Sequence, residues 1–238
     1  MHSFCTIARI NILCRNYKSK KMKKILLTFM ALAIVLSAFA QKDEEARKIL
    51  EKVSTTTKSY STIRIKFKYI MDNRIEKMKD TTKGVIYLKG DKFKLFFKGN
   101  EIFSDGTTVW THMLDADEIT ITDVDKDDDE SLNPANILTI YEKGFKYRFM
   151  GEIKDHGKTY YQIDLYPEHP KEKSYSIVKL KIDKTNYHIS SVKMVGKDGI
   201  DYILDLVEFK PNVKVVDSMF TFDPAKYPKD IEINDMRD

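Results

Sequence analysis

The sequence predicts a mainly β protein whose short antiparallel strands form one sheet, curled into a barrel or a sandwich, with few helices. Runs of alternating apolar and polar residues recur about every 10–12 residues, and turn-forming residues separate many of them. Strands and helices do not alternate, which argues against a nucleotide-binding α/β fold. The composition, 42% hydrophobic and 32% charged, excludes a disordered, collagenous or polytopic membrane protein.

An amphipathic helix is predicted over residues 43–58, because apolar residues recur there at helical spacing and three acidic residues occupy the first turn. The apolar positions are Ala46, Ile49, Leu50 and Val53. From Ile63 to Met71 the period changes to two, with apolar residues at the odd positions and three bases between them. This pattern predicts a half-buried strand with one solvated, basic face.

Ten further runs predict strands, followed by a short apolar piece at Phe220–Phe222. The runs are Gly84–Lys89, Lys92–Lys98, Ile102–Ser104, Thr108–Met113, Glu118–Val124, Phe145–Ile153, Thr159–Tyr166, Tyr175–Ile182, His188–Val195 and Ile200–Phe209. Some of them, such as Val85–Leu88 and Leu95–Phe97, are apolar on both faces. The sheet is therefore expected to be covered on two sides or to enclose a cavity.

An acidic run, Asp123–Glu130, interrupts the strands and leads into a segment from Leu132 to Tyr141. Asn133 can cap a short helix there and Pro134 can occupy its first position. The apolar residues of this segment lie on more than one face of the helix, so we expect the helix to cover another part of the protein rather than to stand free.

The first 40 residues predict a secretory signal peptide. Four lysines flank Met22, an uncharged run of 16 residues follows from Ile25, and the run ends in the A-x-A pattern Ala38–Ala40. A membrane span needs roughly 20 residues, so cleavage is favoured over anchoring. We expect an upstream extension at residues 1–21, a signal peptide at residues 22–40, and a single domain at residues 41–238.

The predicted mature chain carries little net charge and no cysteine. Residues 1–40 hold seven bases and no acid, whereas from Gln41 onward 34 bases face 36 acids, which gives no support to nucleic-acid binding. Cys5 and Cys14 both precede the predicted cleavage site, so neither a disulfide nor a thiol nucleophile is expected. Gln41 follows the cleavage site where a bacterial lipoprotein would have Cys, so acylation there is not expected.

No motif for catalysis, metal binding or cofactor binding was found. The sequence has no G-x-S-x-G, P-loop or G-x-G-x-x-G pattern, and the histidines of the predicted mature chain are scattered. The acidic run places Asp123, Asp125 and Asp127 in an EF-hand register, but Asp128 replaces the required Gly and Pro134 replaces the required Glu. We therefore expect a protein that is not an enzyme, with no catalytic residue, metal or cofactor.

Four motifs resemble those of the outer-membrane lipoprotein carrier (LolA-like) family, in order along the mature chain. Ile102–Thr111 resembles the family's "SDG-x-x-[LV]-W-x-Y" strand pair, with His112 at the position of the Tyr. Gly84–Lys89 resembles "G-x-[IL]-x-[LV]-K", and Asn133–Leu138 resembles the Pro-containing lid helix. Phe220–Pro224 resembles the "F-x-F-x-P" closing strand.

The resemblance implies an open antiparallel β-barrel of about eleven strands with an α-helical lid over an apolar cavity. It implies a monomeric periplasmic carrier that takes acylated lipoproteins from an inner-membrane releasing transporter to an outer-membrane acceptor. Many members of the family place an Arg after the G-x-[IL]-x-[LV]-K strand, where it contacts the lid backbone. Here that position falls on Gly90 or Asp91, so the lid contact is not implied for this chain.

Apolar residues on the strands and in the lid segment are the candidates for lining such a cavity, and a closed, packed core is the alternative interpretation. They are Ile65, Phe67, Tyr69, Tyr87, Phe93, Leu95, Phe97, Trp110, Ile121, Ile137, Leu138, Tyr141, Ile163 and Leu165.

Three other functions compete with a carrier. One is a lipid- or lipoprotein-sensing interaction module of the same fold. A second is a lipidated receptor at the outer membrane, against which Gln41 argues. The third is a secreted hydrolase, which no motif supports.

Overall fold

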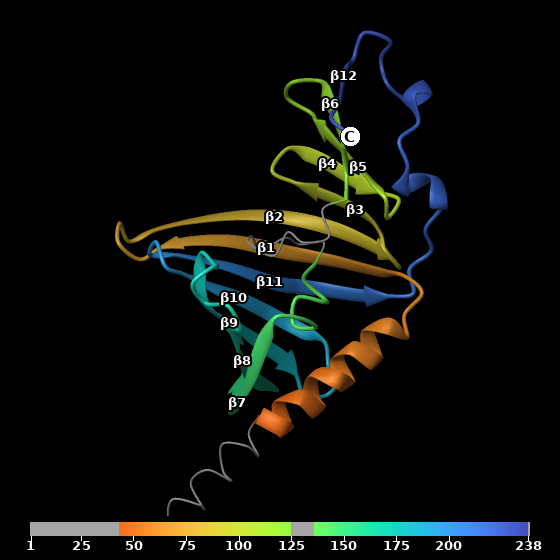
Figure 1. Cartoon of the computed structure of the whole chain (residues 1–238). Coiled ribbons are helices and arrows are strands. Elements are labelled where there is room, and N and C mark those ends of the chain that lie inside the picture. Colours follow the sequence, from red (N-terminus) through yellow and green to blue (C-terminus); the bar gives the residue numbers. More distant parts are fainter. Residues whose placement is uncertain (1–42, 125–135, 238) are drawn as a thin grey trace, which may run out of the picture. The chain divides into compact units, whose positions relative to one another are not determined.

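The computed structural model describes residues 43–124 and 136–237, and twelve strands there form one sheet (Figure 1). The predicted extension and signal peptide, and the start of the predicted lid helix, lie outside these residues. The strands are β1 (Ile63–Asn73), β2 (Met78–Lys89), β3 (Lys92–Phe97), β4 (Asn100–Ser104), β5 (Thr108–Met113), β6 (Glu118–Asp123), β7 (Phe145–Asp155), β8 (Lys158–Pro167), β9 (Tyr175–Asp183), β10 (Ile189–Gly196), β11 (Ile200–Pro211) and β12 (Glu232–Asp235).

The strand order is β12-β6-β5-β4-β3-β2-β1-β11-β10-β9-β8-β7. Two meanders, β1–β6 and β7–β11, meet where β1 pairs with β11, and all their pairs are antiparallel. Only β12 is parallel to its neighbour, β6. Because β12 and β7 are both edge strands, the sheet is open and does not close into a barrel. The predicted class, a mainly β chain with an open antiparallel barrel of about eleven strands and a few helices, is confirmed by this open sheet of twelve strands and its helix.

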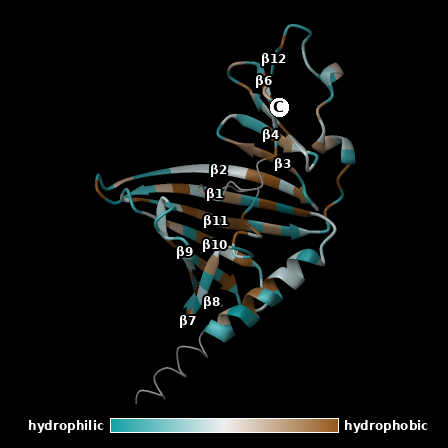
Figure 2. Ribbon diagram, viewed as in Figure 1, coloured by the Kyte–Doolittle hydropathy of each residue, from teal (hydrophilic) through white to brown (hydrophobic). Residues whose placement is uncertain are grey.

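Side chains alternate between the two faces of the sheet. Figure 2 shows bands of hydrophobic and hydrophilic residues along the central strands. In β1 the face with Ile63, Ile65 and Phe67 is buried, whereas the intervening Arg64 is partly exposed and Lys66 is exposed. We call the face of Ile65 the inner face and the face of Arg64 the outer face.

The predicted helix covers residues 43–58 of the described chain. Its residues Ala46, Ile49, Leu50 and Val53 are all buried in one cluster with the inner face of the sheet. The helical periodicity therefore predicted the correct buried stripe.

Residues 136–142 form turns rather than the expected helix. The Thr139 amide donates to the Asn136 carbonyl (3.1 Å), and the Glu142 amide donates to the Thr139 carbonyl (2.9 Å). The Tyr147 hydroxyl donates to the Tyr141 carbonyl (2.9 Å). If the segment continued as a helix, a backbone amide would donate to this carbonyl. The turns still bury their apolar side chains in the inner cluster, namely Ile137, Leu138 and Tyr141.

The C-terminal segment begins after β11 and carries two 3₁₀ turns, η1 (Asp217–Phe220) and η2 (Pro224–Lys226), before β12. The predicted closing strand at Phe220–Phe222 is wrong, because Phe220 ends η1. Asp223 caps η2 by accepting from the Ala225 amide (3.2 Å). Phe220 itself is fully buried, so the apolar pattern reflects packing rather than strand pairing.

The strand pair that carries the Asp-Gly motif is held by its own turn. The Asp105 carboxylate accepts from the amides of Thr107 and Thr108 (both 2.9 Å), and Gly106 adopts a φ of +98°. Burial raises the pKa of Asp105, but these hydrogen bonds outweigh it and hold the pKa below its ordinary value. The motif therefore has a structural role, which is to place β4 beside β5.

Gly84 makes room for an aromatic pair on the inner face. It lies opposite both Phe67 of β1 and Phe97 of β3, and the two rings meet above it at 5.7 Å between centroids. A Cβ at Gly84 would lie 2.3 Å from the Phe67 ring. The first residue of the G-x-[IL]-x-[LV]-K motif thus has to be glycine for the Phe67 ring to occupy its place over β2.

Substituting Gly84→Ala should lower the free energy of unfolding by about 1–3 kcal/mol, because the added methyl forces the Phe67 ring off its site. Urea unfolding followed by circular dichroism measures this. A Gly84→Ala, Phe67→Leu double variant should lose less than the sum of the two single losses, since the smaller side chain relieves the clash. Strict additivity would contradict this account.

Candidate functional site

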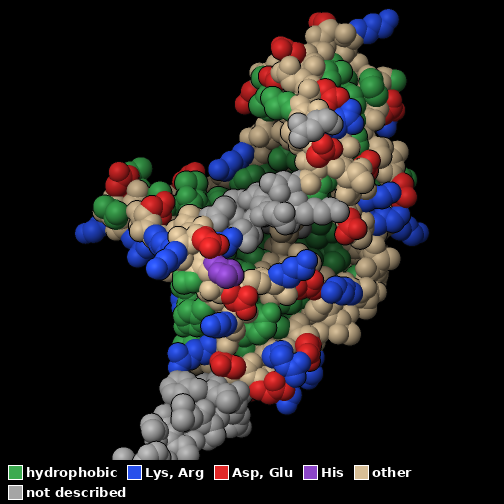
Figure 3. All heavy atoms as spheres, viewed as in Figure 1, with side chains coloured by type: hydrophobic (Ala, Val, Ile, Leu, Met, Phe, Trp, Pro, Cys, Tyr) green, Lys and Arg blue, Asp and Glu red, His purple; other side chains and the backbone are tan. Residues whose placement is uncertain are grey.

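The inner face of the sheet is the main candidate site. The helix 43–58, residues 136–142 and strands from both meanders bury a continuous apolar cluster there. Of the fourteen residues predicted to line a cavity, eight lie inside this cluster: Ile65, Phe67, Leu95, Ile137, Leu138, Tyr141, Ile163 and Leu165. Three more pack against it while partly exposed: Tyr69, Phe93 and Phe97. Figure 3 shows hydrophobic side chains between the charged groups on the side viewed in Figure 1.

The other three predicted residues, Tyr87, Trp110 and Ile121, lie on the outer face. Tyr87 pairs with Arg64 and Lys94, and the Arg64 guanidinium lies over its ring at 5.9 Å. Trp110 lies between Phe103 and Ile121 in the sheet and stacks on Phe103 at 5.7 Å. The structure therefore does not bring these three residues together with the other eleven.

The inner face also contains residues that were not predicted from the sequence as site candidates, among them Leu88, Ile102, Tyr202 and Leu206. All four lie in predicted strands. Each faces the same side of the sheet as a predicted cavity residue of its own strand or of a neighbouring strand. Leu95 lies opposite Ile102, and Phe67 lies opposite Leu206. Cross-strand register was the missing signal.

Four aromatic residues form a cluster at the margin of the inner face: Phe67, Tyr69, Phe97 and Tyr202. The Tyr69 ring meets the Phe97 ring edge-on at 5.3 Å and the Tyr202 ring at 6.2 Å. Only Phe67 is fully buried. Burial, together with the neighbouring Tyr202, raises the pKa of Tyr69, so this hydroxyl stays neutral. This aromatic cluster offers an apolar chain a partly open surface continuous with the buried core.

Residues 136–142 are tied to the helix through Glu142. One oxygen of this carboxylate pairs with the Lys58 ammonium (2.8 Å) and accepts from the Ser54 hydroxyl (2.9 Å). Burial raises the pKa of Glu142, but these two partners outweigh it, so the pKa lies below its ordinary value of 4.5. The ion pair holds residues 136–142 against the helix, and these residues form a cover over the inner cluster.

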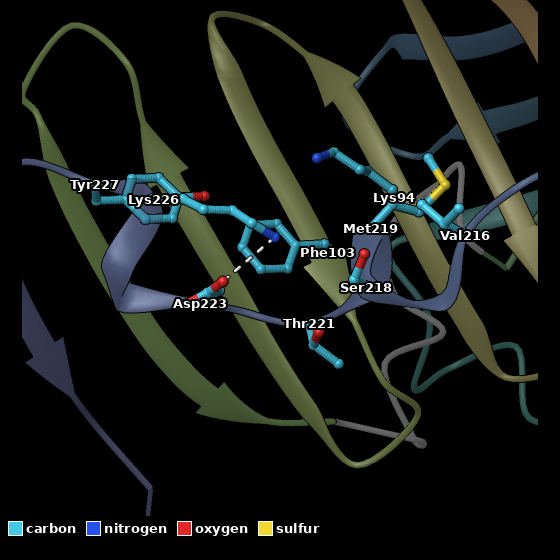
Figure 4. A pocket seen from close by; sticks show the side chains of 9 residues that line it. All are labelled: Lys94, Phe103, Val216, Ser218, Met219, Thr221, Asp223, Lys226 and Tyr227. Atoms are coloured by element: carbon cyan, nitrogen blue, oxygen red, sulfur yellow. Dashed lines mark ion pairs between the residues drawn. The ribbon is translucent and has the colours of Figure 1, made fainter.

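A second concavity of about 270 Å³ lies on the outer face (Figure 4). Lys94 and Phe103 of the sheet line one side, and seven residues between 216 and 227 of the C-terminal segment line the rest. The lysines are neutralised, because Lys94 pairs with Glu101 and Lys226 pairs with Asp223 (3.5 Å). The concavity is small and balanced in charge, unlike the apolar inner face.

Within residues 43–124 and 136–237, no three His, Cys, Asp or Glu side chains are grouped so that they could hold a metal ion. Over the same ranges, none of the helical segments combines the length and apolar character that crossing a membrane requires. The buried His112 packs edge-on against Tyr227 at 5.2 Å on the outer face, away from the inner cluster.

A family model described as "Outer membrane lipoprotein carrier protein LolA" matches residues 36–199. The comparison with curated proteins finds no match.

Among solved structures, an uncharacterized conserved protein from Thermus thermophilus is 16% identical, and the match covers 80% of this chain and 99% of that one with a TM-score of 0.56. At this identity the likeness shows a shared fold. A LolA superfamily protein from Nitrosomonas europaea is 13% identical over 74% of this chain and 97% of that one, with a TM-score of 0.44.

Replacing Glu142 by Gln should lower the free energy of unfolding by about 0.5–1 kcal/mol at pH 7, as expected for a largely exposed ion pair. Because the folded-state pKa is depressed, this stabilisation is present above the ordinary pKa of 4.5 and is lost as pH falls through the folded value. Urea unfolding at pH 7 and pH 3 measures it. Glu172→Gln, an exposed carboxylate, is the control, and an equal loss for Glu142→Gln at both pH values would contradict the assignment.

The single Trp110 should not respond to an apolar ligand on the inner face, because the sheet separates the two. Its emission maximum should stay constant on saturation with decanol. In a Trp110→Phe, Phe97→Trp variant the indole moves to the inner face, and its emission should then shift. A shift in the wild-type protein, or none in the double variant, would refute this placement.

Proposed function

Because the chain belongs to the family of the outer membrane lipoprotein carrier protein LolA, we propose that its inner face binds acyl chains of lipoproteins and carries them between the two membranes. The observation that supports this most directly is the continuous apolar cluster of the inner face, which ends in partly exposed aromatic rings. The opposite, outer face of the sheet carries ion pairs, such as Lys179–Asp164 (3.0 Å) and Lys193–Asp201 (2.8 Å).

Acyl chains need such a surface to cross an aqueous compartment. Each methylene transferred from water to an apolar site is worth about 0.8 kcal/mol, so a long chain leaves a membrane at a useful rate only if a carrier replaces the lipid. The aromatic cluster can contact the first methylenes, and opening the cover of residues 136–142 would give the chain the buried part of the face.

The predicted signal peptide supports a periplasmic site of action, with residues 41–238 acting as one domain. In this proposal the partners are acylated lipoproteins as cargo, an inner-membrane transporter that releases them and an outer-membrane acceptor. The protein works as a monomer without a cofactor, and it binds no nucleic acid.

A second candidate is a lipid- or lipoprotein-sensing interaction module with the same inner face. One observation favours it. The C-terminal segment, which builds the outer-face concavity, lies beyond residue 199, where the family match ends. This segment would give a sensor a second surface for a partner. Transfer of cargo to outer-membrane vesicles separates a carrier from a sensor.

Phe97 and Phe96 offer a matched pair for testing the carrier proposal, since they are neighbours on opposite faces. Phe97 packs against the inner cluster, whereas Phe96 is 41% exposed on the outer face. Phe97→Ser should weaken binding of a triacylated lipopeptide at least about tenfold, because a large apolar contact is lost. Phe96→Ser should leave binding unchanged. Equilibrium dialysis measures both.

The same variants should differ in releasing a tagged lipoprotein from inner-membrane vesicles, where Phe97→Ser fails and Phe96→Ser matches wild type. Circular dichroism establishes that both are folded. If the wild-type protein neither binds the lipopeptide nor releases the lipoprotein, the proposed function is wrong. Binding without release would favour the sensor.

A further inference from the structure

The turn between β3 and β4 places one lysine at the edge of the aromatic cluster. Lys98 and Gly99 have φ values of +54° and +75°, the combination of a two-residue type I′ hairpin turn. The Gly99 carbonyl also accepts from the Leu114 amide (3.2 Å), which ties this turn to the β5–β6 connection. The turn that contains Lys98 is therefore fixed both by its own hairpin and by the β5–β6 connection.

The side chain of Lys98 folds back over the inner face. Its ammonium nitrogen lies 5.4 Å from the centroid of the Tyr69 ring and 5.4 Å from that of the Phe97 ring. Because these two rings touch each other edge-on, one ammonium group contacts both aromatic faces. The charge thus stays next to the partly exposed rings that border the apolar face.

Lys98 differs from many other lysines of the sheet in its charge environment. Lys66 pairs with Glu208 (3.0 Å), and Lys179 and Lys193 also have carboxylate partners. Across the described residues, no carboxylate lies within ion-pairing distance of the Lys98 ammonium. A cation that has no carboxylate partner among residues 43–124 and 136–237 and is held over apolar rings suits an amphiphile whose anionic end meets the ammonium while its alkyl chain lies on the rings.

We propose that Lys98 is a head-group residue of the inner face and that the face binds single-chain anionic amphiphiles, with a carboxylate or phosphate at the Lys98 ammonium. The alkyl chain crosses Phe97 and Tyr69 and continues along the apolar cluster. This inference rests on the proposed function, that the inner face takes acyl chains. It adds a ligand class, because ester- and amide-linked acyl chains carry no charge at the linkage.

Equilibrium dialysis with radiolabelled decanoate, decyl phosphate and decanol tests the inference. The three probes share one chain length and differ in head group, so their relative affinities report the head-group site alone. Wild-type protein should bind at least one of the two anions about tenfold more tightly than decanol, as expected for a charge-assisted hydrogen bond. Which anion binds more tightly distinguishes a carboxylate head group from a phosphate head group.

Lys98→Gln should bring the affinity for the anions down to that for decanol and leave decanol binding unchanged. Lys83→Gln is the matched control, because Lys83 is exposed on the outer face opposite Lys68 and no carboxylate among the described residues pairs with it. It should keep the preference for anions. Circular dichroism checks the fold of both variants.

Each outcome decides between the two proposals. If decanol binds wild-type protein as tightly as both anions, or if Lys83→Gln lowers anion affinity as much as Lys98→Gln, the head-group role of Lys98 is wrong while the binding of acyl chains stands. If none of the three probes binds, the apolar face does not take acyl chains, and both proposals fail together.

Discussion

The pairing of β1 with β2 on one side and β11 on the other determines which face of the sheet each side chain occupies. Ile65 lies opposite Ile86 and Phe209, and the row continues through Leu95 and Ile102 on the inner face. A shift of one residue in this register would exchange the inner row for the outer row, which begins at Arg64. The buried cluster, the aromatic cluster and the position of Trp110 all depend on this one alignment.

The two meanders use their outer faces differently. The outer face of β7–β11 carries ion pairs, such as the one between Lys179 and Asp164 (3.0 Å). The outer face of β3–β6 is apolar at Phe103, Trp110 and Ile121, and the C-terminal segment packs over part of it, with Phe220 fully buried. Because this second apolar layer is partly covered, the inner face is the surface that we propose for acyl chains.

Glycine and turn residues make this arrangement possible at a few defined points. Gly84 allows the Phe67 ring to lie over β2, and Asp105 holds the turn between β4 and β5. The Arg expected in the family near Gly90 is absent, and Gly90 sits in the turn after β2 with a φ of +56°. The ion pair between Glu142 and Lys58 holds residues 136–142 to the helix 43–58.

The sequence by itself determined the elements whose signals are local. The helical spacing from Ala46 to Val53 and the alternation from Ile63 to Met71 each predicted the correct buried side, because one face of each element is apolar and the other polar. Turn residues likewise predicted where most hairpins reverse. Eleven of the fourteen predicted site residues lie in or against the inner cluster for the same reason.

Only the tertiary structure decided the rest. Residues 78–83 carry little apolar pattern, yet they belong to β2 because the pairing with β1 continues to the hairpin turn. Tyr87 and Trp110 lie in strands with apolar residues on both faces, so local periodicity could not say which face was the inner one. Ile121 lies on the one apolar side of β6, but the pairing of β6 with β5 places that side with Trp110 on the outer face. Phe220 packs from a 3₁₀ turn instead of a strand. In each case the outcome depends on pairing or packing between residues far apart in the chain, which no local pattern records.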